Sequence, residues 1–288
     1  MKTQKLPIAL ILGLGMLLGS CGEKTKKNET VIAPVEEMAK EPVYNTEDPA
    51  SILASVAYAH GGWEDLLKKG DVAYTYDYRY PANNDADVST ERYIFKSEVS
   101  FGHYEQHQIN VMPKTPGKVS QFFNGTETTV MHNDAKVEDP QILGGADFLR
   151  RANYFWFVMP YKLGDKGTIV SYLGQEEYNS KVYDKVKVTY DPEITGKEQN
   201  DTYILYVNPT TRLIDRFYFS LPFLGLNDPL IIANYFYETI EGQTVATKRT
   251  YFMPKEDGTY GEEPSLVQTI SDLSFNNGFT TTSILEMN

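Results

Sequence analysis

The feature that most limits the fold of this chain is an alternation of apolar and polar residues at every second position. In residues 72–80 the side chains of Tyr74, Tyr76 and Tyr78 share one face of an extended strand, while threonine, aspartate and arginine occupy the other. Residues 181–190 repeat the pattern, with valines on one side and lysines on the other. Such a chain is expected to form a sheet with one apolar face and one solvent-exposed face.

Twelve segments carry this strand signal, and turn-forming pairs such as Asn124-Gly125 and Asn208-Pro209 separate many of them. Short hairpin-like connections favour antiparallel neighbours, so the sequence predicts a mainly β (α+β) fold built on a large antiparallel sheet or open barrel. The predicted strands are residues 72–80, 88–99, 102–111, 118–123, 127–131, 168–173, 181–190, 202–207, 213–221, 230–239, 244–253 and 266–275.

Two stretches have the apolar spacing of a helix. Residues 48–68 form the first, interrupted at Gly61-Gly62, and residues 141–159 form the second, which we expect Pro160 to end. The apolar stripe of the second helix is wider than a normal core face, so that helix must be largely enclosed. Its apolar residues include Leu149, Ala152, Phe155, Trp156 and Met159.

Residues 1–20 have the layout of a secretory signal peptide, with Lys2 and Lys5 before an apolar stretch that contains no acidic residue. That stretch is shorter than the roughly 20 apolar residues that span a bilayer, so we expect the segment to be removed. The sequence Leu18-Gly19-Ser20-Cys21 resembles the bacterial lipobox. This resemblance implies that Cys21 is acylated and becomes the anchored N-terminus; the alternative is an ordinary signal followed by an incidental cysteine.

Cys21 is the single cysteine of the sequence, so internal disulfides are excluded and the fold must be held by its core. Residues 21–47 are polar and poor in aromatic residues, which predicts a flexible tether, and residues 48–288 are predicted to form one domain. Removal of the signal takes two of the 27 basic residues, and the 39 acidic residues then leave a net charge of −14. This charge argues against nucleic acid as a partner.

The order of these elements resembles the plan of the LolA-like family, which includes outer-membrane lipoprotein-sorting proteins. Locally the resemblance is carried by residues 63–67, 203–214 and 270–278, and residues 153–163 also resemble uncharacterised Bacteroidota lipoproteins. The resemblance implies a large curved antiparallel sheet that forms an open half-barrel of about 11–12 strands. An N-terminal helix and an apolar helix inserted midway would cover it, and its concave face would shelter acyl chains.

The sorting carrier of that family is a soluble shuttle, whereas the lipobox would fix this chain to a membrane. A fixed acceptor or lipid-handling role therefore fits better than transport across the periplasm. We expect a monomer in the bacterial cell envelope, anchored by the Cys21 lipid. Gly22-Glu23-Lys24 after the cysteine is no clear inner-membrane retention signal, so the outer membrane is the expected location, at its periplasmic face or at the cell surface.

The sequence gives little support to catalysis. It contains no Gly-x-Ser-x-Gly elbow, phosphate-binding loop or dinucleotide fingerprint, so we predict neither an enzyme nor a cofactor. His103 and His107 would lie about 13 Å apart on one strand face, too far to share a metal ion, so no metal site is predicted. We interpret His60 and His132 as solvated surface residues. A glycan or lipid hydrolase would need carboxylates from different strands to face one cleft.

The aromatic strand faces allow two interpretations. They form either plain core, which would make the protein a non-catalytic envelope interaction or structural module with a filled barrel, or the wall of a groove for a lipid, acyl chain or other hydrophobic ligand. The apolar helix favours the groove, because a helix across the mouth of a curved sheet leaves a lined cavity. The predicted groove residues are Leu149, Ala152, Phe155, Trp156 and Met159 of the helix, with Tyr74, Tyr76 and Tyr78 of the first strand.

Overall fold

The computed structural model describes residues 40–196, 199–222 and 225–286, and the described residues form one antiparallel sheet of thirteen strands. The first six strands are β1 (Asp71–Arg79), β2 (Ala86–Ile94), β3 (Val99–His107), β4 (Val119–Phe123), β5 (Thr128–His132) and β6 (Ala135–Lys136). The remaining strands are β7 (Thr168–Tyr178), β8 (Lys181–Tyr190), β9 (Tyr203–Val207), β10 (Ile214–Leu221), β11 (Leu226–Ile240), β12 (Gln243–Phe252) and β13 (Leu266–Phe275).

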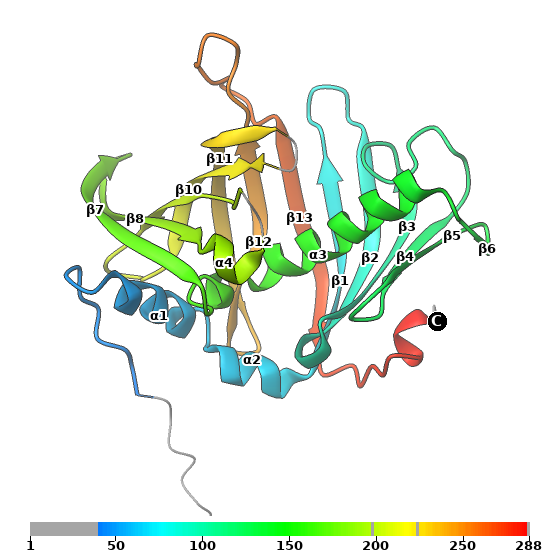
Figure 1. The fold of residues 1–288 in the computed structure, drawn as a ribbon, viewed down its shortest axis with the longest axis horizontal. Coiled ribbons are helices and arrows are strands. Elements are labelled where there is room, and N and C mark those ends of the chain that lie inside the picture. The colour runs from blue at the N-terminus through cyan, green and yellow to red at the C-terminus, as the bar shows by residue number, and fades with distance from the viewer. Residues whose placement is uncertain (1–39, 197–198, 223–224, 287–288) are drawn as a thin grey trace, which may run out of the picture. The chain divides into compact units, whose positions relative to one another are not determined.

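The strand order in space is β6-β5-β4-β3-β2-β1-β13-β12-β11-β10-β9-β8-β7 (Figure 1). The N-terminal strand β1 therefore lies inside the sheet, between β2 and the C-terminal strand β13. The end strands β6 and β7 do not pair with each other, so the sheet is open. The predicted fold class, mainly β with a large open antiparallel sheet, is confirmed.

Each of the twelve predicted strands overlaps an observed strand. The thirteenth, β6, has two residues and is too short to show an alternation. The predicted segments 88–99 and 102–111 are displaced, because the chain turns between β2 and β3 in a 3₁₀ helix, Phe95–Ser97, followed by Glu98. Glu98 has a φ of 54°, which lies in the left-handed region that ends a strand.

The first predicted helix is observed in two parts, α1 (Pro49–Ala59) and α2 (Trp63–Lys69). Gly61 and Gly62 separate them, and both have positive φ, so the predicted break is confirmed. A Cβ atom at Gly61 would lie 2.6 Å from the carbonyl oxygen of Gly242. The chain can make this close approach only with glycine.

The second predicted helix is observed as α3 (Pro140–Lys162). The Asp139 side chain caps its start by accepting from backbone N–H groups of the first turn. The prediction that Pro160 ends the helix is wrong, because Pro160 lies within α3. Proline leaves the carbonyl of Trp156 without its helical donor. Arg249 of β12 donates to that oxygen instead, which allows the helix to continue.

Helix α3 lies against one face of the sheet and contributes to its two largest buried clusters (Figure 1). Met159 and Leu163 pack with α1 and with strands β8 to β12. Tyr154 and Phe157 pack with β1, β2 and α2, and the Phe157 ring stacks on Tyr74 with centroids 5.3 Å apart. Since each fully buried apolar side chain contributes about 1.5–3 kcal/mol, this helix is an integral part of the core.

A buried ion pair fixes α3 to the sheet. Arg150 donates through both Nη atoms to the two carboxylate oxygens of Glu91 at 2.7 and 2.9 Å, and neither side chain is exposed to solvent. Its Nε donates to Gln121 at 3.1 Å, and Nη2 also contacts the hydroxyl of Tyr104. A Cβ atom at Gly102 would collide with the guanidinium. The network therefore sets the place where α3 rests on β2, β3 and β4.

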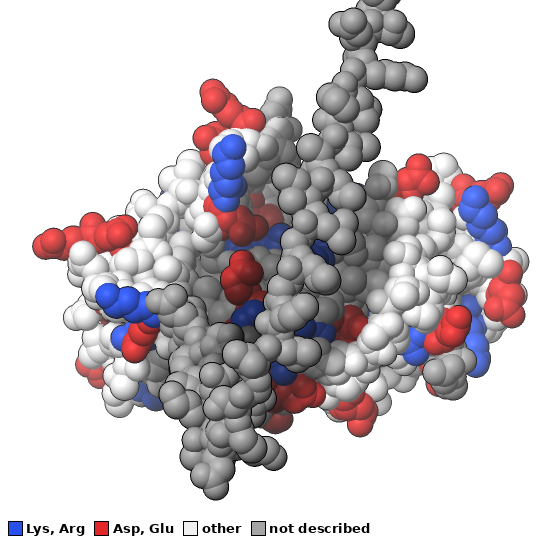
Figure 2. Space-filling model, turned by 90° about the horizontal axis from the view of Figure 1, so that it is seen from below, with Lys and Arg blue, Asp and Glu red and all other residues white. Residues whose placement is uncertain are grey.

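Charged side chains do not form a single-sign patch on the described surface that Figure 2 shows, where acidic and basic residues are interspersed. Lysines are in several cases paired, as in Lys185 with Glu176 and Lys162 with Glu98, both at 2.6 Å. Within the part of the chain that the structure describes, no helix combines the length and apolarity needed to cross a bilayer.

Candidate hydrophobic groove

A groove with a volume of about 510 Å³ lies beside α3. The helix forms one wall, and the facing wall comes from the ends of β8 and β10, the start of β9 and the segment that precedes β9. This volume lies within the range of small-molecule sites. The apolar part of the lining includes Ala152, Phe155, Trp156, Tyr190, Tyr203 and Leu221, and the polar part includes Asp147, Arg151 and Asp201.

Three of the eight predicted groove residues line this groove. Ala152, Phe155 and Trp156 occupy successive turns of one side of α3, and all three are half-buried. Their spacing along the helix directs them away from β1 and toward β8 and β9. The groove therefore lies over one flank of the sheet and not over its centre.

The structure does not place the other five predicted residues in this groove. Met159 and Tyr74 lie in the buried core, with exposed fractions of 1% and 3%. Leu149, Tyr76 and Tyr78 line a separate hollow of about 10 Å³ on the other side of the helix, which is no larger than one water molecule. Helix α3 packs so closely on β1 that side chains fill the space where a central groove was expected.

Sequence reasoning missed the residues of the facing wall. Tyr190 and Tyr203 come from β8 and β9, and Leu221 ends β10. Tyr190 falls on the apolar side of its predicted strand, which is the signal that these strands face the helix. The sequence alone could not show that β8 and β9 lie beside α3, because the strand order in space is a tertiary property.

The floor of the groove is aromatic and electrically neutral. The Trp156 ring lies edge-on to Phe219 with centroids 5.2 Å apart, and Phe155 is 6.2 Å from Tyr203. Burial, together with nearby Asp201, raises the pKa of the Tyr203 hydroxyl well above its ordinary value. The hydroxyl is therefore un-ionised throughout the physiological pH range, and the floor offers contact surface for an apolar chain.

A second hollow of about 190 Å³ adjoins the other side of the same helix turn. Arg151 and Phe155 border both this hollow and the groove. Its lining also contains Phe123 from β4, Tyr154 and Lys162. The two spaces together give α3 an edge lined by apolar groups and by charged groups of both signs, since Glu98 also borders the second hollow.

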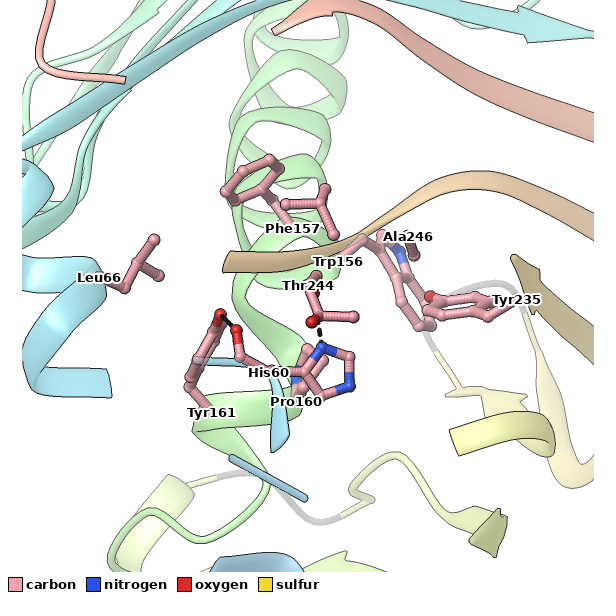
Figure 3. A pocket seen from close by; sticks show the side chains of 10 residues that line it. His60, Leu66, Trp156, Phe157, Pro160, Tyr161, Tyr235, Thr244 and Ala246 are labelled. Carbon is pink, nitrogen blue, oxygen red and sulfur yellow. Dashed lines mark hydrogen bonds between the residues drawn. The ribbon is translucent and has the colours of Figure 1, made fainter. Parts of the chain in front are cut away.

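A small enclosed pocket of about 10 Å³ lies under α3, where His60 points toward the strand β12 (Figure 3). The expectation that His60 is solvated is wrong, because only 1% of it is exposed. Its Nδ1 lies 2.7 Å from the carbonyl oxygen of Thr244, which requires the proton on Nδ1, and its Nε2 has no hydrogen-bond partner among the residues that the structure describes. Burial lowers the pKa of His60 to about 4. His60 is therefore a neutral core residue at physiological pH.

His103 and His107 both lie in β3, as predicted, but the strand is irregular between them, because Tyr104 pairs with Ser89 and Gln106 with Val88 while Glu105 has no pairing partner on β2. His103 Nδ1 lies 2.8 Å from Ser120 Oγ, and His107 places its two ring nitrogens 2.8 Å from the carbonyl oxygens of Val111 and Gly117. Both nitrogens of His107 are thus engaged. Among the described residues, no three His, Cys, Asp or Glu side chains are grouped to hold a metal ion.

Comparison with protein families gives one match. Residues 128–225, about a third of the chain, match the model of a family of unknown function, DUF6503. This segment contains α3 and all of the residues that line the groove. No curated protein matches the chain.

Comparison with solved structures finds LolA-type proteins at low sequence identity. A domain described as an outer membrane lipoprotein-sorting protein domain, from Vibrio parahaemolyticus, is 10% identical with a TM-score of 0.49, over 84% of this chain and 97% of its own. A DUF1329 family protein from Desulfovibrio piger is 10% identical with a TM-score of 0.48, over 82% and 97%. A LolA superfamily protein from Nitrosomonas europaea is 13% identical with a TM-score of 0.44, over 77% and 97%.

Proposed function

We propose that this protein is a non-catalytic, membrane-anchored lipoprotein that holds an acyl chain or similar hydrophobic ligand in the groove beside α3. The observation that carries the proposal is the groove itself, a space of about 510 Å³ with an aromatic floor formed by Phe155, Trp156 and Tyr203. An apolar cavity of this size with a few polar groups at its edge is the usual form of a small-molecule site.

Physical chemistry supports an apolar ligand. Half-buried aromatic and aliphatic side chains exposed to water in a groove gain free energy when an apolar chain covers them, at roughly 25 cal/mol per Å². The neutral hydroxyl of Tyr203 adds no charge to the floor. The narrow hollow beneath α3, by contrast, has no room for a chain, so we place the ligand on the β8 and β9 side of the helix.

The anchor belongs to the same proposal. Cys21 and the rest of residues 1–39 lie outside the described residues, so the lipobox, the signal and the outer-membrane location are proposals from sequence. A chain fixed by acyl groups at Cys21 would receive or present a ligand near its own membrane. The boundary of the tether at residue 47 is likewise a proposal from sequence; Tyr44, just before that boundary, donates to Asp184 of β8 at 2.7 Å.

Native mass spectrometry of the protein purified from host membranes tests both parts. The proposal expects cleavage before Cys21, a mass increase that corresponds to acylation of that residue, and a further noncovalent lipid adduct released on activation. A Cys21→Ser chain serves as the control that loses the first mass increase and keeps the adduct. An unmodified Cys21 would refute the anchor. A spectrum without a lipid adduct, from folded protein whose bound lipid was not exchanged during purification, would refute ligand binding.

A further inference from the structure

Arg151 lies at the junction between the groove and the second hollow, and only some of the N–H donors of its guanidinium are bonded to neighbouring residues. Arg151 Nε donates to Asp147 at 2.9 Å, within one turn of α3. Asp147 accepts a second hydrogen bond at its other oxygen from Thr128, at 2.7 Å. In the described part of the chain, the two Nη groups of Arg151 donate to no side chain or carbonyl.

The position of Arg151 is set by packing as well as by charge. Its guanidinium lies over the ring of Phe123, with Cζ 4.3 Å from the centroid. Stacking on a ring and bonding through Nε together hold the guanidinium plane, and among the described residues they leave the outer edge that carries the two Nη groups without a hydrogen-bond acceptor. The side chain is 54% exposed, and it borders both cavities.

From these contacts we propose that Arg151 is the headgroup contact of the groove ligand, and that this ligand carries an oxyanion, a carboxylate or phosphate, at one end of its acyl chain. The inference rests on the proposed function. Two adjacent N–H donors of a planar guanidinium match the two oxygens of such a group. The apolar tail would lie along Phe155 and Trp156, and the oxyanion would reach the donors where the groove meets the second hollow.

The other charged groups that border the two spaces are the buried Arg150, Lys162 and three acidic side chains, Asp147, Asp201 and Glu98. Lys162, in the second hollow, is already paired with Glu98 at 2.6 Å and Asp165 at 3.5 Å, so it is a weaker candidate for the contact. Asp201 belongs to the facing wall, across the groove from α3. Arg151 is thus the cation best placed to distinguish an acid from a neutral lipid.

The test compares palmitate with methyl palmitate, which has the same chain and no charge. It uses the full chain carrying Cys21→Ser, so that the protein's own acyl groups do not compete. Palmitate should bind roughly fivefold more tightly than the ester, as expected for one half-exposed charged contact. In Arg151→Gln the ratio of the two affinities should fall to near one, and in Asp147→Asn it should rise, because a neighbouring negative charge is removed.

Arg79→Gln is the matched control, because Arg79 is also a partly exposed arginine paired with an aspartate, Asp77, at 2.6 Å, and it is not in the groove. It should leave the affinity ratio unchanged. Equal binding of acid and ester to the starting chain, or an Arg151→Gln ratio that does not move, would overturn the headgroup assignment and leave the proposed function standing. Failure of both ligands to bind would refute the proposed function itself. Inorganic phosphate that binds as tightly as palmitate would show a plain anion site and would also overturn the assignment.

Discussion

The Nη2 atom of Arg249 lies 3.2 Å from the carbonyl oxygen of Trp156 and supplies the hydrogen bond that Pro160 cannot give. Arg249 is 3% exposed, its guanidinium lies 5.2 Å from the centre of the Tyr235 ring, and in the described part of the chain no carboxylate forms an ion pair with it. A strand residue therefore completes the helix whose side chains form the groove.

This relationship predicts a coupling between positions 249 and 160. Arg249→Met should cost about 2 kcal/mol of unfolding free energy, the order of a lost hydrogen bond from a charged donor. In a Pro160→Ala background the new alanine N–H can bond to Trp156, so the same change should cost about 1 kcal/mol less. Urea unfolding of the four proteins measures this difference. Costs that add to within about 0.5 kcal/mol would show that the two positions act independently.

The buried ion pair of Arg150 and Glu91 predicts a large loss of unfolding free energy when the carboxylate of Glu91 is replaced by an amide. Glu91→Gln leaves a guanidinium with no counter-charge in a site without solvent, and should cost about 3–5 kcal/mol. Asp65→Asn breaks an exposed pair with Lys68 and should cost less than about 1 kcal/mol. Chemical denaturation compares the two. Similar small costs would mean that the Glu91 pair does not hold α3 in place.

His60 predicts a specific dependence of stability on pH. Its folded pKa of about 4 lies below the unfolded value of 6.5, so the unfolded state binds the proton first as pH falls. The contribution of His60 is complete above pH 6.5 and is lost between pH 6.5 and about 4, up to about 3 kcal/mol. His60→Gln keeps a side-chain N–H donor and cannot titrate. The unfolding free energy of the starting protein should therefore fall more steeply in this window than that of the variant; parallel curves would contradict the assignment.

The sequence predicts local features of this protein better than their arrangement. Alternation locates twelve strands, and the glycine pair locates the break between α1 and α2. The prediction that Pro160 ends α3 fails because the donor that replaces the missing N–H, Arg249, is distant in the sequence. The prediction that His60 is solvated fails because no neighbouring residue in the sequence indicates that β12 covers it. For the groove, the helix side was predictable from its apolar stripe, whereas Tyr190 and Tyr203 depend on which strands lie beside α3.

The central claim, that the groove beside α3 holds an acyl chain, is tested most directly by titration of a fluorescent palmitate analogue into the full chain with Cys21→Ser. We expect saturable binding of one molecule per chain, weakened at least about tenfold by Ala152→Phe, which fills the groove, and by Trp156→Ala, which removes part of its floor. Gln141→Phe, at an exposed position of the same helix, is the control and should bind as the starting chain does. Folded protein that shows no saturable uptake, or equal uptake by all four chains, would contradict the claim.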